Sequence, residues 1–301
     1  MKRILILADM EGCNGVSNLA DYMDCKNKMI KDVDSIISTI YTISTKFEVS
    51  LVDCHNTGET LHEYAKSKKI SFYKQLWTIP NVSDYDFAFL IGFHPPKGKP
   101  GRLPHTIRPD IERLLLGSVP IGEVTLLINW LSYYGVNVVF ITGEMSIRDE
   151  LIGYPCEFLA THEKNSGSTA ELTKHMRTAL FKKYEVPKYN DLEIFLELVN
   201  SKYLDFLPKE LFSINNNRVC YHDTKTFVDE LPILCTFLNV CESFQSWRMH
   251  YISRYIQKNK LCASDSPLLH NLLCNKEWRA LSDEDIASIY SEISRRVTKD
   301  A

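Results

Sequence analysis

The sequence predicts an α/β fold with a mainly parallel sheet flanked by helices, a smaller second α/β domain and a helical C-terminal extension. Short apolar runs in the first half have the length of strands, at residues 4–8, 49–52, 87–91 and 136–141. Longer amphipathic segments, such as residues 28–45 and 122–134, lie between them. Apolar strands that alternate with helices are typical of β-α-β units, in which helices cover both faces of a parallel sheet.

The pattern changes after the first half, and we expect three parts. Beyond residue 151, a helical segment and further short apolar runs indicate a smaller α/β domain. From about residue 245 the sequence is amphipathic, with Trp247, Tyr251 and Tyr255 at helix-like spacing. The expected parts are a domain that holds the candidate functional residues, a smaller domain, and a helical extension for subunit or partner contacts, over residues 1–151, 152–244 and 245–301.

Composition and charge exclude several classes of protein. A hydrophobic fraction of 45% excludes a disordered chain. There are 35 basic and 38 acidic residues without a dense basic stretch, so we expect no nucleic-acid partner. The first apolar run ends at Asp9, too early for a membrane span, and the 9 cysteines form no Cys-x-x-Cys pair. We therefore expect a cytoplasmic protein with reduced thiols and no membrane partner.

Polar side chains directly follow three of the predicted strands. Asp9 and Glu11 come after the first strand, His55 after the second and His94 after the third. In open α/β sheets, ligands bind in the crevice beyond the carboxyl ends of the strands. We therefore expect these side chains to converge on one crevice.

The run Asp9-Met10-Glu11-Gly12 provides two carboxylates for one ligand. In an extended chain, residues two apart point the same way, and glycine allows a close turn. Carboxylates combined with imidazoles suit zinc, or manganese or cobalt in its place. Taken alone, the run also fits a magnesium site or a solvated turn, and a lone histidine at a strand end is more often structural than a metal ligand.

Two further residues complete the candidate set. Glu123 follows Gly122 at the start of a predicted helix, where the helix dipole by itself favours an acidic residue. His105 follows a segment rich in proline and glycine, so we expect it to be partly exposed. An imidazole there could transfer protons near neutral pH, or it could be an ordinary surface histidine.

The combined set resembles the DppA-type D-aminopeptidase family of dinuclear zinc peptidases. The order and spacing of the motifs agree with the family, in segments 9–12, 52–55, 92–94, 100–105 and 119–123. The resemblance covers the first half well, the stretch to about residue 243 loosely, and the last part not at all. Within the second segment, Cys54 departs from the family's usual serine, and Asp53 either orients His55 or satisfies local backbone groups.

The resemblance implies a role for each candidate residue. Asp9 would bridge two zinc ions, with Glu11 and His55 on one ion and His94 and Glu123 on the other. His105 would be the catalytic nucleophile or base. The implied activity is aminopeptidase cleavage of a small or modified peptide, or of a peptide-like amide, with a free amino terminus. The family also implies a ring-like homo-oligomer, and it makes residues 1–151 the catalytic metal-binding domain.

Two other functions fit parts of the pattern. A magnesium-dependent phosphohydrolase also has acidic residues after a first parallel strand, but it needs a lysine and a second acidic cluster rather than two strand-end histidines. A non-catalytic scaffold could hold metal for stability alone. Activity on unblocked peptides distinguishes the scaffold from the peptidase, and the bound metal distinguishes the phosphohydrolase.

Overall fold

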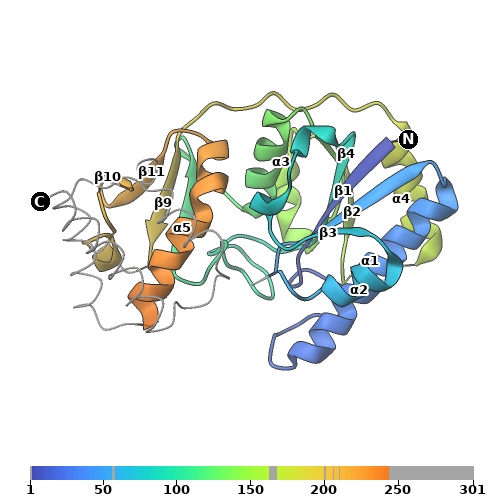
Figure 1. Cartoon of the computed structure of the whole chain (residues 1–301), viewed down its shortest axis with the longest axis horizontal. Coiled ribbons are helices and arrows are strands. Elements are labelled where there is room, and N and C mark those ends of the chain that lie inside the picture. The colour runs from blue at the N-terminus through green and yellow to red at the C-terminus, as the bar shows by residue number, and fades with distance from the viewer. Residues whose placement is uncertain are drawn as a thin grey trace, which may run out of the picture. The chain divides into compact units, whose positions relative to one another are not determined.

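The computed structural model describes residues 2–55, 58–162, 168–199, 201–205, 207–209 and 211–243 (Figure 1). The chain divides into two compact units, the first of Met1–Pro109 and Val119–Asp191, the second of Asp110–Ser118 and Leu192–Ala301. Residues 152–191 thus group with the first unit, while the sequence-based domain boundaries remain predictions. The expected helical extension over residues 245–301 lies outside the described residues.

The first unit contains a six-stranded parallel sheet, which confirms the predicted fold class. Its strand order is β3-β2-β1-β4-β7-β8, with β1 (Lys2–Ala8), β2 (Phe47–Asp53), β3 (Ser71–Tyr73), β4 (Phe87–Phe93), β7 (Asn137–Gly143) and β8 (Glu157–Ala160). The chain adds β2 and β3 on one side of β1, and then β4, β7 and β8 on the other. The strand order therefore reverses between β1 and β4, the point at which such sheets form their ligand crevice.

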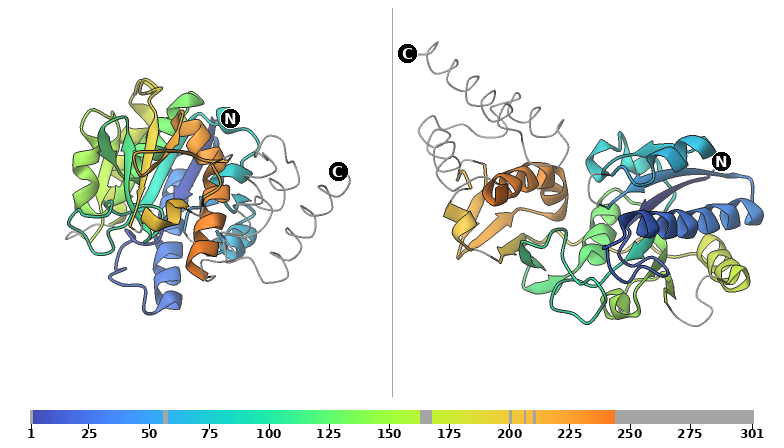
Figure 2. Two further views of the ribbon diagram at one scale, coloured as in Figure 1. Left: turned by 90° about the vertical axis from the view of Figure 1, so that its left-hand side faces the viewer. Right: turned by 90° about the horizontal axis from the view of Figure 1, so that it is seen from below.

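Helices cover this sheet because its strands are apolar on both faces. The helices are α1 (Tyr22–Ile43), α2 (His62–Lys68), α3 (Glu123–Tyr133) and α4 (Thr169–Phe181). Helices α1 and α4 contact each other, as Figure 2 shows, and share a core with Ile4 and Ile6 of β1. Leu5 and Leu7 alternate with these residues and are also fully buried, while α3 packs on β4 and β7.

The second unit is built around a sheet in which β10, β11, β9 and β5 pair antiparallel in that order. The strands are β5 (Ile111–Leu116), β6 (Val119–Ile121), β9 (Ile194–Leu198), β10 (Ser213–Asn215) and β11 (Arg218–Tyr221). Helix α5 (Thr224–Ser243) contacts β11. Short 3-10 helices complete the described structure: η1 (Leu76–Thr78), η2 (Val82–Asp84), η3 (Met145–Leu151) and η4 (Ser201–Asp205).

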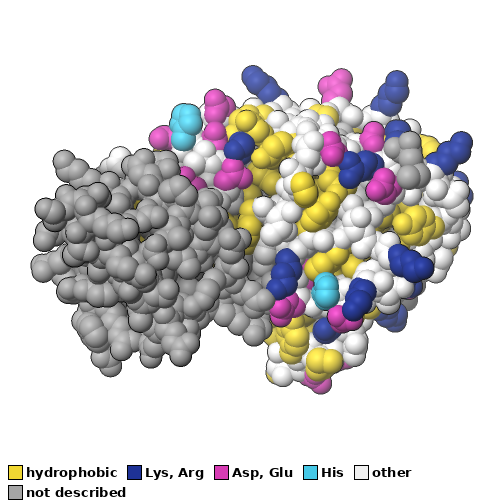
Figure 3. All heavy atoms as spheres, viewed as in Figure 1, with side chains coloured by type: hydrophobic (Ala, Val, Ile, Leu, Met, Phe, Trp, Pro, Cys, Tyr) yellow, Lys and Arg dark blue, Asp and Glu magenta, His cyan; other side chains and the backbone are white. Residues whose placement is uncertain are grey.

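The surface and the helices agree with the composition. On the face of the first unit seen in Figure 3, basic and acidic side chains are interspersed, as nearly balanced charge predicts. Among the described residues, no helix combines the length and the apolar character needed to cross a bilayer.

The end of β1 lies directly against the end of β4. The Asp9 amide donates to the Ile91 carbonyl and the Gly12 amide to the Gly92 carbonyl, each at 2.8 Å. A Cβ atom at Gly12 would lie 1.8 Å from the backbone oxygen of Phe93. Only glycine therefore allows the segment after β1 to lie this close, and the contact fixes the positions of Asp9 and Glu11.

We predict that Gly12→Ala destabilises the protein strongly, because the clash is with backbone and cannot be relieved by a side-chain rotation. The expected loss is about 3 kcal/mol of unfolding free energy. Gly98→Ala is the comparison, since a Cβ there meets nothing within 4 Å and only the left-handed backbone at φ 82° opposes it, at about 1 kcal/mol. Thermal unfolding of both variants checks this. Equal shifts in midpoint would show that the contact with β4 does not require glycine.

Candidate metal centre

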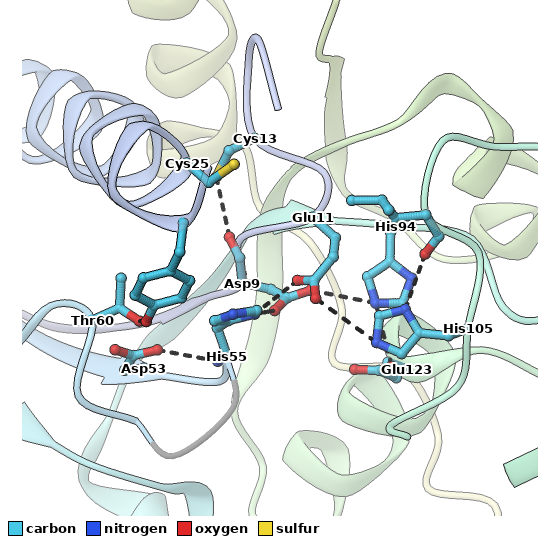
Figure 4. Close-up of polar contacts among 12 residues, drawn as sticks. Asp9, Glu11, Cys13, Cys25, Asp53, His55, Thr60, His94, His105 and Glu123 are labelled. Atoms are coloured by element: carbon cyan, nitrogen blue, oxygen red, sulfur yellow. Dashed lines mark hydrogen bonds and ion pairs between the residues drawn. The ribbon is translucent and has the colours of Figure 1, made fainter. Parts of the chain in front are cut away.

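The six candidate residues converge at the point where the strand order reverses, all within the first unit (Figure 4). Five of them lie just after a strand or at the start of a helix, and His105 lies within a longer connection. Their positions are: Asp9 and Glu11 after β1, His55 after β2, His94 after β4, His105 between β4 and β5, and Glu123 as the first residue of α3. The sequence-based expectation of a common crevice agrees with this arrangement.

Asp9, Glu11 and His55 form one buried group of three donor atoms that all lie within 4.8 Å of one another. The His55 Nδ1 atom is 3.0 Å from Glu11 Oε2 and 3.8 Å from Asp9 Oδ1. Two oxygens and one imidazole nitrogen converging in this way match the ligand types and spacing of a zinc site.

His94, His105 and Glu123 form a second group with the same spacing limit of 4.8 Å. The His94 Nε2 atom lies 3.5 Å from Glu123 Oε1 and 3.5 Å from Asp9 Oδ2. Asp9 therefore directs one carboxylate oxygen toward each group.

The second of these Asp9 oxygens indicates that the centre fits a cation. Asp9 Oδ2 is buried and accepts no hydrogen bond from any described residue. A buried carboxylate oxygen without a hydrogen-bond donor is unfavourable unless a positive charge lies beside it. Protonated His94 supplies such a charge in the metal-free protein, and a bridging divalent metal would supply it in the loaded protein.

Backbone carbonyls set the orientation of two of the imidazoles. His94 Nδ1 lies 3.0 Å from the Pro95 carbonyl oxygen, and His105 Nδ1 lies 2.9 Å from that of Leu103. Because a carbonyl only accepts, Nδ1 carries the hydrogen in both rings, and Nε2 faces the carboxylates. The two rings stack with centroids 4.0 Å apart. His105 keeps 24% of its side chain exposed, whereas His94 keeps 1%.

The ionisation of the metal-free centre follows from its burial and its charges. Burial, followed by the nearby charge of Glu11, raises the pKa of Asp9 to about 7. Burial lowers the pKa of His55, but hydrogen bonds with Asp9 and Glu11 outweigh it and raise the value to about 11. Burial also opposes the charge of His94, but Glu123 outweighs it and raises the pKa to about 10. The two imidazoles therefore hold protons at neutral pH.

Asp53 holds the backbone around His55 rather than its ring. Its carboxylate accepts from the amides of His55 at 3.1 Å and Leu61 at 2.9 Å, and burial raises its pKa to about 6. Of the two roles left open for Asp53 by the sequence, the hydrogen bonds support the satisfaction of local backbone groups. The ring of His55 instead stacks on Tyr22 at 6.1 Å between centroids.

A buried glutamate, Glu144, and a partly buried one, Glu150, support the centre without belonging to either donor group. The Glu144 carboxylate, directly after β7, accepts from the Arg102 amide at 3.0 Å and so holds the segment that carries His105. Glu150 Oε2 accepts from the Gly122 amide at 2.8 Å and so caps the helix that begins with Glu123. The position of Glu144 after a strand gives a signal in the sequence, but nothing near Glu150 marks it.

The centre also depends on one backbone contact to Glu123. The amide of Ile107 donates to Glu123 Oε1 at 2.6 Å, and Ile107 has a left-handed φ of 61°. Burial raises the pKa of Glu123, but the charge of His94 outweighs this and lowers it overall. The carboxylate is therefore held ionised and oriented toward His94.

Comparison with known proteins confirms the resemblance drawn from the motifs. A family model described as D-aminopeptidase matches residues 1–183, which include all six candidate residues. Among solved structures, the chain is similar to the Zn-dependent D-aminopeptidase DppA from Bacillus subtilis, a self-compartmentalizing protease, with a TM-score of 0.66. The similarity has 18% identity and covers 78% of this chain and 96% of that one, so it concerns the fold. A comparison with curated protein sequences found no match.

We predict that zinc binding at pH 7 releases protons from the centre. His55 and His94 have pKa values of about 11 and 10 in the metal-free protein, so both are protonated and must lose a proton before they bind metal. Titration calorimetry in two buffers of different ionisation enthalpy should give a release of about two to three protons per chain, two from these imidazoles and a fraction from Asp9, whose pKa is about 7. Zinc affinity should rise with pH toward these pKa values. Identical heats in both buffers would contradict the prediction.

Proposed function

Because the chain belongs to the D-aminopeptidase family of peptidases, we propose that it is a zinc-dependent aminopeptidase that hydrolyses small peptides or peptide-like amides. The observation that carries the proposal is the buried carboxylate of Asp9, whose two oxygens face two separate groups of donors. This arrangement supports two metal ions rather than one.

In the proposed centre, Asp9 bridges two zinc ions. Glu11 and His55 complete one ion's protein ligands, and His94 and Glu123 complete the other's. When bound, the two ions would stabilise negative charge on the substrate carbonyl and favour deprotonation of water at neutral pH. Manganese or cobalt could replace zinc with the same ligands.

His105 is proposed to transfer the proton. Its Nε2 atom faces the centre, 3.9 Å from Glu11 Oε1, while the Leu103 carbonyl holds Nδ1. A partly exposed imidazole held in this way can take a proton from the attacking water and return it to the leaving amine. His105 also lies within ligand distance of His94 and Glu123, so the rival role is a third ligand in that group.

Substrate class and assembly rest on the relatives. The family description supports a substrate with a free amino group beside a D-residue. The solved structure named above is called a self-compartmentalizing protease, which supports a homo-oligomer here as well. We propose that the protein acts in the cytoplasm on short or modified peptides.

The rival functions receive less support from the centre. Each donor group contains histidine, the ligand type that favours zinc over the magnesium of a phosphohydrolase. His105 is partly exposed and directs its Nε2 atom toward the donors, which is more than a metal-stabilised scaffold requires.

Turnover on three matched short peptides tests the proposal. We expect the zinc-loaded chain to hydrolyse a dipeptide with amino-terminal D-Ala, to cleave the L-Ala form more slowly, and to leave the amino-acetylated form intact. Chelation should abolish activity and zinc should restore it. Release of phosphate from a phosphomonoester with magnesium, without peptide cleavage, would instead favour the phosphohydrolase.

We expect the Asp9→Ala variant to lose both zinc ions, because Asp9 is proposed to hold both. Retention of about two equivalents of zinc per chain would refute the proposed bridging role of Asp9.

We expect His105→Ala to lower turnover by about 10²–10⁴-fold with zinc content unchanged, because it removes the proton carrier but none of the five proposed ligands. His62→Ala is the matched control, since His62 is an exposed histidine at the start of α2 with no contact to the centre. Zinc per chain, measured by atomic absorption beside kcat, separates the two roles. Loss of one zinc equivalent would make His105 a ligand, and unchanged turnover would remove it from the mechanism.

A further inference from the structure

The first unit contains a cavity of about 570 Å³ that shares no residue with the candidate metal centre. It is lined by three elements: the strand β8, the 3-10 helix η3 and the first half of α4. Figure 1 labels α4. Because β8 is the outermost strand of the sheet, the cavity lies along an edge of that sheet.

This edge presents backbone groups that have no partner strand. The Thr161 amide donates to the Gly143 carbonyl at 2.8 Å, so the backbone N–H of Thr161 points toward β7. Backbone groups alternate in direction along a strand, and the N–H and C=O groups of Phe158 and Ala160 therefore face away from β7. No described strand pairs with this side of β8. An edge of this kind is a template for one more strand.

The cavity also contains two charged side chains without a partner of opposite charge among the described residues. Arg148 of η3 lines one wall and is exposed. Glu171 of α4 lines another wall. In contrast, the His175 Nδ1 atom lies 3.0 Å from Glu157 Oε2, so each of these two side chains already has a polar partner.

The rim of the cavity is apolar. Ile152 is 80% exposed and Met145 42% exposed, and both line the cavity together with Tyr154. Exposed apolar side chains beside an open strand edge favour a ligand that carries its own apolar side chains.

We propose that this cavity binds a short extended peptide, which adds to the edge of β8 and places its free carboxylate at Arg148. A peptide backbone matches the alternating donors and acceptors of a strand edge, and arginine binds a carboxylate with two parallel hydrogen bonds. The carboxylate of Glu171 repels ligands with several negative charges, which disfavours a nucleotide or a phosphate. The proposed site binds a peptide without cleaving it, so a binding test does not depend on the proposed peptidase activity.

Fluorescence anisotropy with the full chain tests the proposal. The probe is a six-residue peptide of alternating Val and Thr, with fluorescein on its amino terminus and a free carboxylate. The label blocks the amino group, so an aminopeptidase cannot degrade the probe. We expect saturable binding, weakened about tenfold by Arg148→Gln. Arg177→Gln is the matched control, because Arg177 is an exposed arginine of α4 that does not line the cavity.

Two altered probes separate the elements of the proposal. A probe with a carboxyl-terminal amide should bind the unaltered chain about tenfold more weakly than the acid does, because the amide has no charge for Arg148. The Arg148→Gln variant should bind the acid and the amide with equal affinity. N-methylation of alternate residues, on the side that pairs, should abolish binding. Failure of the first probe to bind, or equal binding by the N-methylated probe, overturns the proposal. If the probe does not bind and Arg148→Gln lowers the mass measured by light scattering, a second copy of the chain occupies the edge instead.

Discussion

The buried carboxylate of Asp9 is the interaction on which the rest of the centre depends. One of its oxygens faces His55 and the other faces His94, so the ends of β2 and β4 are oriented around a single charge. A buried carboxylate is unfavourable unless positive charge and hydrogen-bond donors surround it. The arrangement of imidazoles and glutamates around Asp9 therefore reflects the electrostatic requirement of one residue, whether protons or metal ions supply the positive charge.

The part of the fold that carries this charge could be predicted from the sequence. The sheet buries both faces of four strands, β1, β2, β4 and β7. Their sequences are therefore continuous apolar runs, which are easy to recognise. The donors follow strands or begin a helix, where neither a core nor a strand ladder explains an acidic or histidine residue. His105 had no such position, and only the resemblance to a family distinguished it from a surface histidine.

Other features could not be predicted because the residues involved are distant in sequence. Glu150 of the 3-10 helix η3 caps α3, and no local sequence pattern marks its contact with Gly122. The second unit takes in residues 110–118 from the middle of the chain, where β5 pairs with β9, and no local pattern in the sequence indicates this long-range pairing. Short strands such as β10 also carry too few residues for a period to be read.

The tautomers of His94 and His105 have a consequence for any attempt to redesign the protein. In both rings the hydrogen on Nδ1 is held by a backbone carbonyl of the connection between β4 and β5, that of Pro95 for His94 and that of Leu103 for His105. A graft that replaces this segment to accommodate a different substrate would therefore rotate a proposed ligand and the proposed proton carrier at once. A substitution at Tyr22, whose ring stacks on His55 without holding either of these hydrogens, would leave both tautomers in place.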